Sequence, residues 1–343
     1  MSQVPLSNSE RILALQRFGY TECEAAFLCL AALHSGYFLR RQFRQFTGTK
    51  NGGTISQVID KVLANSHAKA STWKQNTQLY HLCTRPFYEA LGQGENRHRR
   101  IRALLAIKNK IMCLDFVLGH RGYPDLATEQ EKLDYFTGTL KIDASCLPAK
   151  LYRSTSGAVT TTRYFVEKYP IFLDLSAPQR AQPVVSFSFI DEGAASISGF
   201  ETFLDHYARL FAALPEFRVI YVADREKHSK SAEELFTRML AHSQGSAPDP
   251  LISRKLEFFD MRKLYEAKDL ASFDRAKLIR FREDSREFSG AENDALYRLW
   301  KARGEAAVLE KFGPAASPRA AMRGRFSTCV LDHDYGFFGR FPG

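Results

Sequence analysis

A stripe of apolar residues at helical spacing lies between two chain breaks early in the sequence. Asn51-Gly52-Gly53 interrupts the preceding segment, and Thr54 is placed to cap a new helix. Apolar side chains then recur at i, i+3, i+4, i+7 and i+8: Ile55, Val58, Ile59, Val62 and Leu63. This spacing predicts an amphipathic helix that buries one face, ends near Ser66 and exposes short polar groups on the other face.

Two further helices are expected before this stripe. Residues 22–33 are nearly all apolar and follow Thr21, a suitable N-cap residue, which predicts a short buried helix. Residues 37–46 are apolar on one helical face and basic on the other, which predicts an amphipathic second helix. Its basic face carries Arg40, Arg41 and Arg44.

A hairpin is expected after the third helix. Residues 67–82 have the β-branched and aromatic content of two strands, with a polar turn at Lys74-Gln75-Asn76. Three helices followed by a hairpin, with the third helix polar on its outer face, predict a winged helix-turn-helix over residues 20–92. In that fold the third helix enters the DNA major groove and the hairpin turn is the wing.

The basic residues of the chain are concentrated in the same region. Residues 37–110 hold 14 Lys or Arg and three Asp or Glu, whereas the whole chain has a net charge of +10, so the remainder is close to neutral. Such a segment is typical of proteins that neutralise DNA phosphates. There are two alternatives. The segment is a solvated basic face without a ligand, or the winged helix docks a protein. The concentration of charge favours double-stranded DNA.

Ten side chains are the predicted DNA contacts. The third helix offers residues for base or phosphate contacts, the second helix offers arginines for backbone phosphates, and the wing offers two lysines. They are Thr54, Ser56, Gln57, Lys61 and Asn65 on the third helix, Arg40, Arg41 and Arg44 on the second, and Lys69 and Lys74 on the wing.

The rest of the chain predicts an α+β protein. Residues 97–118 read as one long basic helix that bridges two domains, pairs with its copy in a dimer, or packs on its own C-terminal domain. Strand-like and helical runs then alternate, which predicts an α/β domain with a mixed sheet. The expected parts are an N-terminal arm (1–19), the winged helix (20–92), the linker helix (93–120), the α/β domain (121–312) and an irregular tail (313–343).

One family has a similar plan. A winged helix ending in Tyr80-His81-Leu82, then a long basic helix, then FSFIDEG (residues 187–193) before a GFxxFLxxYxxLF helix (199–211), resembles the replication-relaxation proteins of bacterial mobile elements. The resemblance covers residues 20–240. It implies that the second half has a restriction-endonuclease-like fold.

The residues of such a nuclease site are incomplete. A metal-dependent enzyme of that fold needs an Asp on one strand and Glu-x-Lys or Asp-x-Lys on the next. Asp174 ends a suitable strand, but the next strand offers Ser186-Phe187-Ser188, and Asp191-Glu192-Gly193 follows without a lysine nearby. Glu167-Lys168 are adjacent, so their side chains would leave a strand on opposite faces. We therefore expect no catalytic residue here.

Other functional classes are also disfavoured. The sequence has no GxxxxGK[ST], GxGxxG, HExxH or GxSxG motif, and its six cysteines lack metal-ligand spacing, so we expect no cofactor and no bound metal. It has no apolar run long enough for a membrane span and no signal peptide, which predicts a cytoplasmic protein.

Together these observations predict a non-enzymatic, sequence-specific DNA-binding protein. A transcriptional regulator, or an accessory factor of a mobile element or defence locus, fits best; it would be a homodimer whose second half binds a protein partner or a small effector. The alternative is a metal-dependent nuclease or replication enzyme with an unrecognised active site. Plasmid cleavage with Mg²⁺ or Mn²⁺ that is abolished by Asp174→Ala would favour that alternative.

Overall fold

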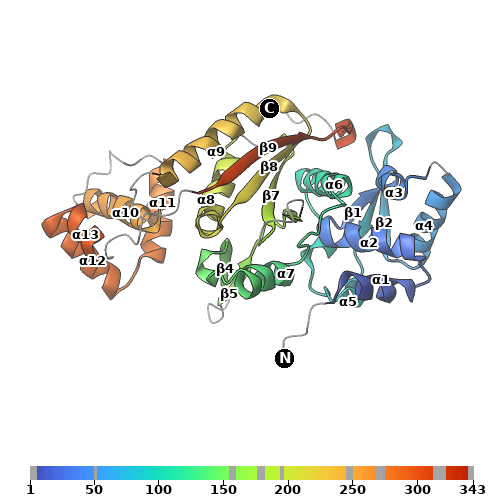
Figure 1. The fold of residues 1–343 in the computed structure, drawn as a ribbon, viewed down its shortest axis with the longest axis horizontal. Helices are drawn as coiled ribbons and strands as arrows, with labels where there is room; N and C mark the ends of the chain where they lie inside the picture. The colour runs from blue at the N-terminus through green and yellow to red at the C-terminus, as the bar shows by residue number, and fades with distance from the viewer. Residues whose placement is uncertain are drawn as a thin grey trace. The chain divides into compact units, whose positions relative to one another are not determined.

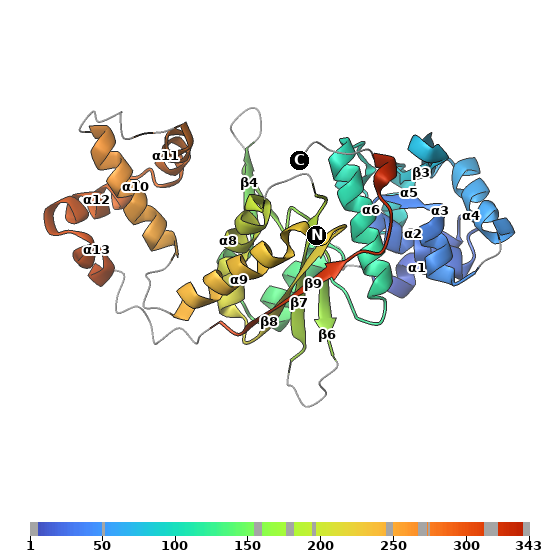
Figure 2. The same ribbon diagram turned by 90° about the horizontal axis from the view of Figure 1, so that it is seen from above.

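The computed structural model describes residues 6–49, 52–153, 160–175, 182–193, 197–244, 250–266, 273, 275–311 and 322–338. The chain divides into two compact units (Figures 1 and 2). The first contains Met1–Arg238 and Arg323–Gly343, and the second contains Met239–Met322. Residues 20–92 therefore share a compact unit with the mixed sheet.

Five helices belong to the N-terminal part of the first unit. Capping boxes start the first two, in which Ser7 and Thr21 accept a hydrogen bond from a backbone N–H while Glu10 and Glu24 accept one in return. The five helices are α1 (Asn8–Gln16), α2 (Glu22–His34), α3 (Arg40–Thr47), α4 (Gly52–Ala64) and α5 (Arg85–Ala90). The nearly all-apolar helix α2 is buried against its neighbours, as expected.

A three-stranded antiparallel sheet completes this part. Its strands are β1 (Tyr37–Leu39), β2 (Ala68–Thr72) and β3 (Gln78–Leu82), in the order β1-β3-β2. The prediction of a helix from Tyr37 was wrong at its start, because residues 37–39 pair with β3. Helix α3 begins at Arg40, where the Gln42 side chain accepts a hydrogen bond from the Leu39 amide and so caps the helix.

Helix α4 is the predicted third helix. Ile55, Val58, Ile59 and Val62 are buried, whereas Leu63, at the edge of the stripe, is 36% exposed. The helix begins at Gly52, so the prediction that Thr54 is the N-cap was wrong: Thr54 lies within the first turn. The hairpin β2–β3 and its turn at Lys74–Asn76 lie where residues 67–82 predicted them.

Helix α6 (Leu104–Gly119) is shorter than predicted and is buried. Residues 97–99 form a separate 3-10 turn, and the chain is extended up to Ala103, partly because the Arg102 amide donates to the Tyr37 hydroxyl. The prediction of one helix from Arg97 was therefore wrong. Helix α6 packs on α2, α3 and β1 on one side and on β7 on the other. Helix α6 therefore lies between the N-terminal helices and the mixed sheet.

A mixed four-stranded sheet forms the centre of the first unit. Its strands run in the order β6 (Ile171–Asp174), β7 (Val184–Asp191), β8 (Phe217–Ala223) and β9 (Gly324–Val330). β6 is antiparallel to β7, and the other pairs are parallel. The prediction of an irregular tail over 313–343 was wrong at residues 324–330, because their hydrogen bonds to β8 form the last strand of the sheet.

Helices cover both faces of this sheet (Figures 1 and 2). Successive residues of β8 point to opposite faces: Ile220 packs in the cluster that contains Ile111 of α6, whereas the Tyr221 ring lies 5.2 Å from that of Phe200 in α8. Helices α8 (Ser198–Ala213) and α9 (Ser229–Gln244) lie on the side opposite to α6. A separate hairpin, β4 (Ala149–Arg153) and β5 (Thr160–Tyr164), lies near helix α7 (Glu129–Leu133).

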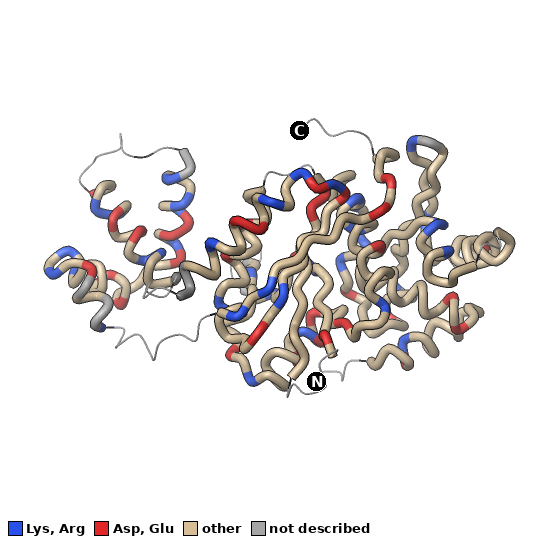
Figure 3. Tube along the Cα trace, turned by 45° about the horizontal axis from the view of Figure 1, so that its top comes forward, with Lys and Arg blue, Asp and Glu red and all other residues tan. Residues whose placement is uncertain are grey.

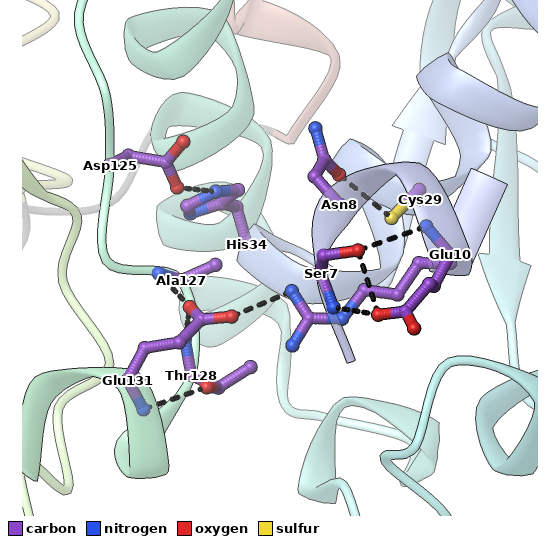
Figure 4. A network of polar contacts seen from close by, with 10 residues as sticks. Ser7, Asn8, Glu10, Cys29, His34, Asp125, Ala127, Thr128 and Glu131 are labelled. Carbon is purple, nitrogen blue, oxygen red and sulfur yellow. Dashed lines mark hydrogen bonds and ion pairs between the residues drawn. The ribbon is translucent and has the colours of Figure 1, made fainter. Parts of the chain in front are cut away.

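A salt bridge and a histidine–carboxylate contact join the N-terminal helices to α7 and to the segment before it. The Arg11 guanidinium of α1 lies 2.7 Å from the Glu131 carboxylate, and the His34 ring at the end of α2 lies 2.8 Å from Asp125. Figure 4 shows His34 directed at Asp125 and the Glu131 carboxylate directed back at the Ala127 amide. Both partners of each pair are largely buried, so these contacts fix the N-terminal helices on the rest of the unit.

The second unit is a cluster of helices. They are α10 (Pro250–Glu266), α11 (Arg275–Glu287), α12 (Ala291–Arg303) and α13 (Glu305–Lys311), and their core contains Phe258, Phe259, Phe281 and Leu296. Lys and Arg alternate with Asp and Glu along these helices (Figure 3). Nowhere in the described residues does a helix reach the length and apolarity of a membrane span.

Candidate nucleic-acid interface

The outer face of α4 is polar and partly unoccupied. Gln57 and Asp60 are exposed, and Thr54 and Ser56 are half-buried. Gln57 makes no side-chain hydrogen bond among the described residues, so its amide is available to a ligand. Because the buried stripe fixes the rotation of α4, this face points away from the core in the register that the sequence predicted.

Two of the predicted contacts on α4 are already bound within the chain. The Lys61 ammonium lies 2.8 Å from the Glu24 carboxylate of α2, which is buried. The Asn65 amide nitrogen donates to the Phe18 carbonyl oxygen at 3.0 Å. Both contacts fasten α4 to the end of α1 and the start of α2. We therefore leave Lys61 and Asn65 out of the proposed interface.

The three arginines of α3 have three different environments. Arg40 is exposed and donates to the Ser56 hydroxyl at 2.8 Å, which brings the basic face of α3 to the polar face of α4. Arg44 is exposed, and its guanidinium has no hydrogen bond or ion pair among the described residues. Arg41 makes a bidentate contact to Asp115 of α6, at 2.5 and 2.7 Å, and is not available as the predicted phosphate contact.

The hairpin presents the remaining predicted lysines. Lys69 lies on β2, opposite His81 of β3, and Lys74 lies in the turn; both are exposed. A ring contact holds the turn: Trp73, directly before it, packs edge-on against Phe338, with ring centroids 5.5 Å apart. The hairpin therefore rests on the C-terminal segment of the chain.

Arg121 is a basic residue of this region that the sequence did not indicate. Its guanidinium lies 3.8 Å from the Phe46 ring centre and donates to the Phe46 carbonyl oxygen at 2.6 Å. Arg121 is exposed and lies beside the C-terminal end of α3, where the Phe46 carbonyl is located. It is 75 residues away in the sequence, so no local pattern could have placed it there.

A buried carboxylate holds α3 in place. Asp115 of α6 accepts hydrogen bonds from Arg41, from the Gln42 amide at 2.8 Å and from the Tyr335 hydroxyl at 2.7 Å. Burial, and then the Asp115 charge, raise the pKa of Tyr335, so its hydroxyl stays protonated and donates. Helix α3, helix α6 and the C-terminal segment thus meet at one side chain.

The strand ends that the nuclease alternative requires are engaged in other contacts. Asp174 lies 3.6 Å from the Arg218 guanidinium, and Asp191 accepts a hydrogen bond from the Tyr221 hydroxyl. The Lys108 ammonium, from α6, lies 2.7 Å from Asp224. Among the residues that the structure describes, no three His, Cys, Asp or Glu side chains are grouped closely enough to hold a metal ion.

Comparison with protein-family models, with curated proteins and with solved structures found no match to this chain.

Proposed function

We propose that this chain binds double-stranded DNA sequence-specifically through a winged helix-turn-helix over residues 20–92. The observation that carries the proposal is the arrangement of α4, which buries its apolar stripe against α2 and the β1-β3-β2 sheet and leaves a polar face beside exposed basic groups. A transcriptional regulator, or an accessory factor of a mobile element or defence locus, would use such a surface.

The proposed contacts are fewer than the ten that the sequence predicted. Arg44, Lys69 and Lys74 would bind backbone phosphates, with Arg121 beside them. Arg40, Thr54, Ser56 and Gln57 would lie along the groove, where Gln57 has the donor and acceptor needed to read an adenine edge. These residues are exposed or half-buried, and none of them forms an ion pair among the described residues.

We further propose a restriction-endonuclease-like frame that has no catalytic role. Support comes from the order of a helix (α6), an antiparallel pair (β6 and β7), a helix (α8) and a strand parallel to β7 (β8). The strand after Asp174 carries Ser186 and Ser188, both buried, where a nuclease would need a carboxylate and a lysine.

Selection from a random duplex library tests the proposal. The full chain should enrich one motif, and its affinity for that motif should exceed that for an unrelated duplex by about 10³-fold or more at physiological salt. Equal binding to every duplex would reduce the chain to a non-specific DNA-coating protein, and no binding at low salt would refute the proposal.

Gln57→Ala should relax specificity. Loss of one bidentate base contact is expected to reduce discrimination at one base pair by about 1–3 kcal/mol, while binding to unrelated duplexes changes little, because phosphate contacts remain. Titration of the selected duplex and its single-base variants measures this. Asp60→Asn changes an exposed side chain one turn further along the same face of α4. It is the matched control and shows whether any change of this helix surface alters discrimination. Unchanged discrimination in Gln57→Ala would show that the assumed orientation of α4 on DNA is wrong.

The predicted homodimer has no support from α6. Most residues of this helix are buried in its own chain, so the segment 97–118 does not offer the exposed apolar stripe that was considered for dimerisation. Dimerisation remains a proposal, which light scattering of the 38.9 kDa chain decides directly.

A further inference from the structure

A basic cleft of about 350 Å³ lies within the first unit, away from α4. It is lined by the loop after α5, by the start of α7 and by β5 with the residues that follow it. Two acidic side chains, Glu95 and Glu129, line it, against five basic ones. The basic residues are Arg85, Arg97, Lys132, Arg163 and Lys168.

The acidic residues leave part of this positive charge unbalanced. Arg85 pairs with Glu89 at 2.7 Å and with Glu95 at 3.5 Å, and Arg163 pairs with Glu129 at 3.0 Å. Lys132 donates instead to the Tyr169 carbonyl oxygen, and Lys168 donates to the Asn96 side-chain oxygen, each at 2.8 Å. Neither lysine forms an ion pair with a described residue. Both ammonium groups are therefore held in place by neutral acceptors, and the nearby carboxylates of Asp125 and Glu131 for Lys132, and of Glu129 for Lys168, act on them only through space.

Burial makes this arrangement unfavourable without a counter-charge. The Lys132 side chain is only 3% exposed. Burial lowers the pKa of Lys132 to about 8, with Lys110 adding to the effect, and lowers the pKa of Lys168 to about 7, with Lys110, Lys132 and Arg163 adding to it. A bound anion would supply the missing charge and hold both lysines protonated.

We propose that this cleft binds a small phosphate-bearing molecule through Lys132, Lys168 and Arg97. Arg97 and the lysines can donate several charge-assisted hydrogen bonds to phosphate oxygens. The volume suits a ligand of mononucleotide size, and Phe165 and Val166 provide an apolar wall.

Calorimetric titration without DNA tests this site independently of the proposed DNA binding. The full chain should bind sodium pyrophosphate or AMP with a dissociation constant below about 1 mM at low salt. Lys168→Met and Lys132→Met should each weaken binding about tenfold or more. Lys227→Met removes an exposed lysine outside the cleft and should leave the affinity unchanged. Comparison of the two probes shows whether a nucleoside adds to the affinity.

Arg97→Ala provides a test if the lysine variants do not fold, because Arg97 is half-buried and its guanidinium packs on the Tyr152 ring at the surface. It should lower affinity for both probes without changing the melting temperature in their absence. The proposal is overturned if neither probe binds at about 10 mM, or if folded Lys168→Met and Arg97→Ala proteins bind as the wild type does. A third outcome also overturns it: the wild type binds neither probe, and the variants weaken duplex binding. The cleft would then be part of the DNA-binding surface.

Discussion

Asp115→Ala is expected to lower the free energy of unfolding of the first unit by about 3–5 kcal/mol, because one change removes the common partner of several buried groups. The carboxylate is 0% exposed, and it is the anion that Arg41 contacts with two hydrogen bonds. Without it, the buried Gln42 amide loses an acceptor, and the Arg41 guanidinium, whose side chain is 30% exposed, loses its counter-charge. The Tyr335 hydroxyl loses its acceptor as well.

Chemical denaturation followed by circular dichroism measures this effect. Asp115→Asn keeps the shape and one acceptor oxygen, so its cost should be smaller than that of Asp115→Ala. Asp60→Ala removes an exposed carboxylate from α4 and should change the stability by less than about 0.5 kcal/mol. If Asp115→Ala cost no more than Asp60→Ala, the three-way contact of α3, α6 and the C-terminal segment would not hold the unit together.

Truncation after residue 322 should abolish folding of the first unit, whereas excision of the helical unit should not. Strand β9 pairs with β8 at seven positions, and the segment after it buries Tyr335, Phe337 and Phe338. Loss of a buried aromatic side chain costs about 3–5 kcal/mol. Three such losses exceed the whole stability of a typical domain, about 5–15 kcal/mol, once the strand pairing is removed as well.

The excised chain is the matched control for this truncation. It joins Gln244 at the end of α9 to residue 322 through a short Gly/Ser linker and keeps β9. Because the second unit has its own core, its removal should leave the first unit with cooperative thermal unfolding and resistance to protease. Cooperative melting of the truncated chain, or failure of the excised chain to fold, would contradict this account of how the sheet is completed.

Local patterns in the sequence predicted much of the N-terminal fold. The spacing of Ile55, Val58, Ile59 and Val62 gave the buried face of α4, and the hairpin at 67–82 followed from its composition. The same patterns misplaced helix starts, since the strand at Tyr37–Leu39 depends on pairing with β3, which is distant in sequence. Periodicity shows which face of an element is buried, but not what the element packs against.

Long-range pairing explains why three of the predicted contact residues are engaged within the chain. Arg41, Lys61 and Asn65 stand on the polar faces that the sequence indicated, yet their partners are Asp115, Glu24 and the Phe18 carbonyl, which lie 74, 37 and 47 residues away. Strand β9 was missed because the second unit separates it from β8. Phe326, Thr328 and Val330 are residue types that favour a strand, whereas the Gly, Pro and Arg residues around them predicted an irregular tail.

The salt dependence of DNA binding tests the central claim most directly. Fluorescence anisotropy with a labelled duplex should show log K falling linearly with log salt concentration in the wild-type chain. Arg44→Ala, Lys69→Ala and Lys74→Ala combined should weaken binding to every duplex and reduce the slope by about 3, one for each lost phosphate contact. Lys227→Ala, an exposed lysine outside the proposed interface, should keep the wild-type slope. A triple variant with the wild-type affinity and slope would contradict the proposed interface.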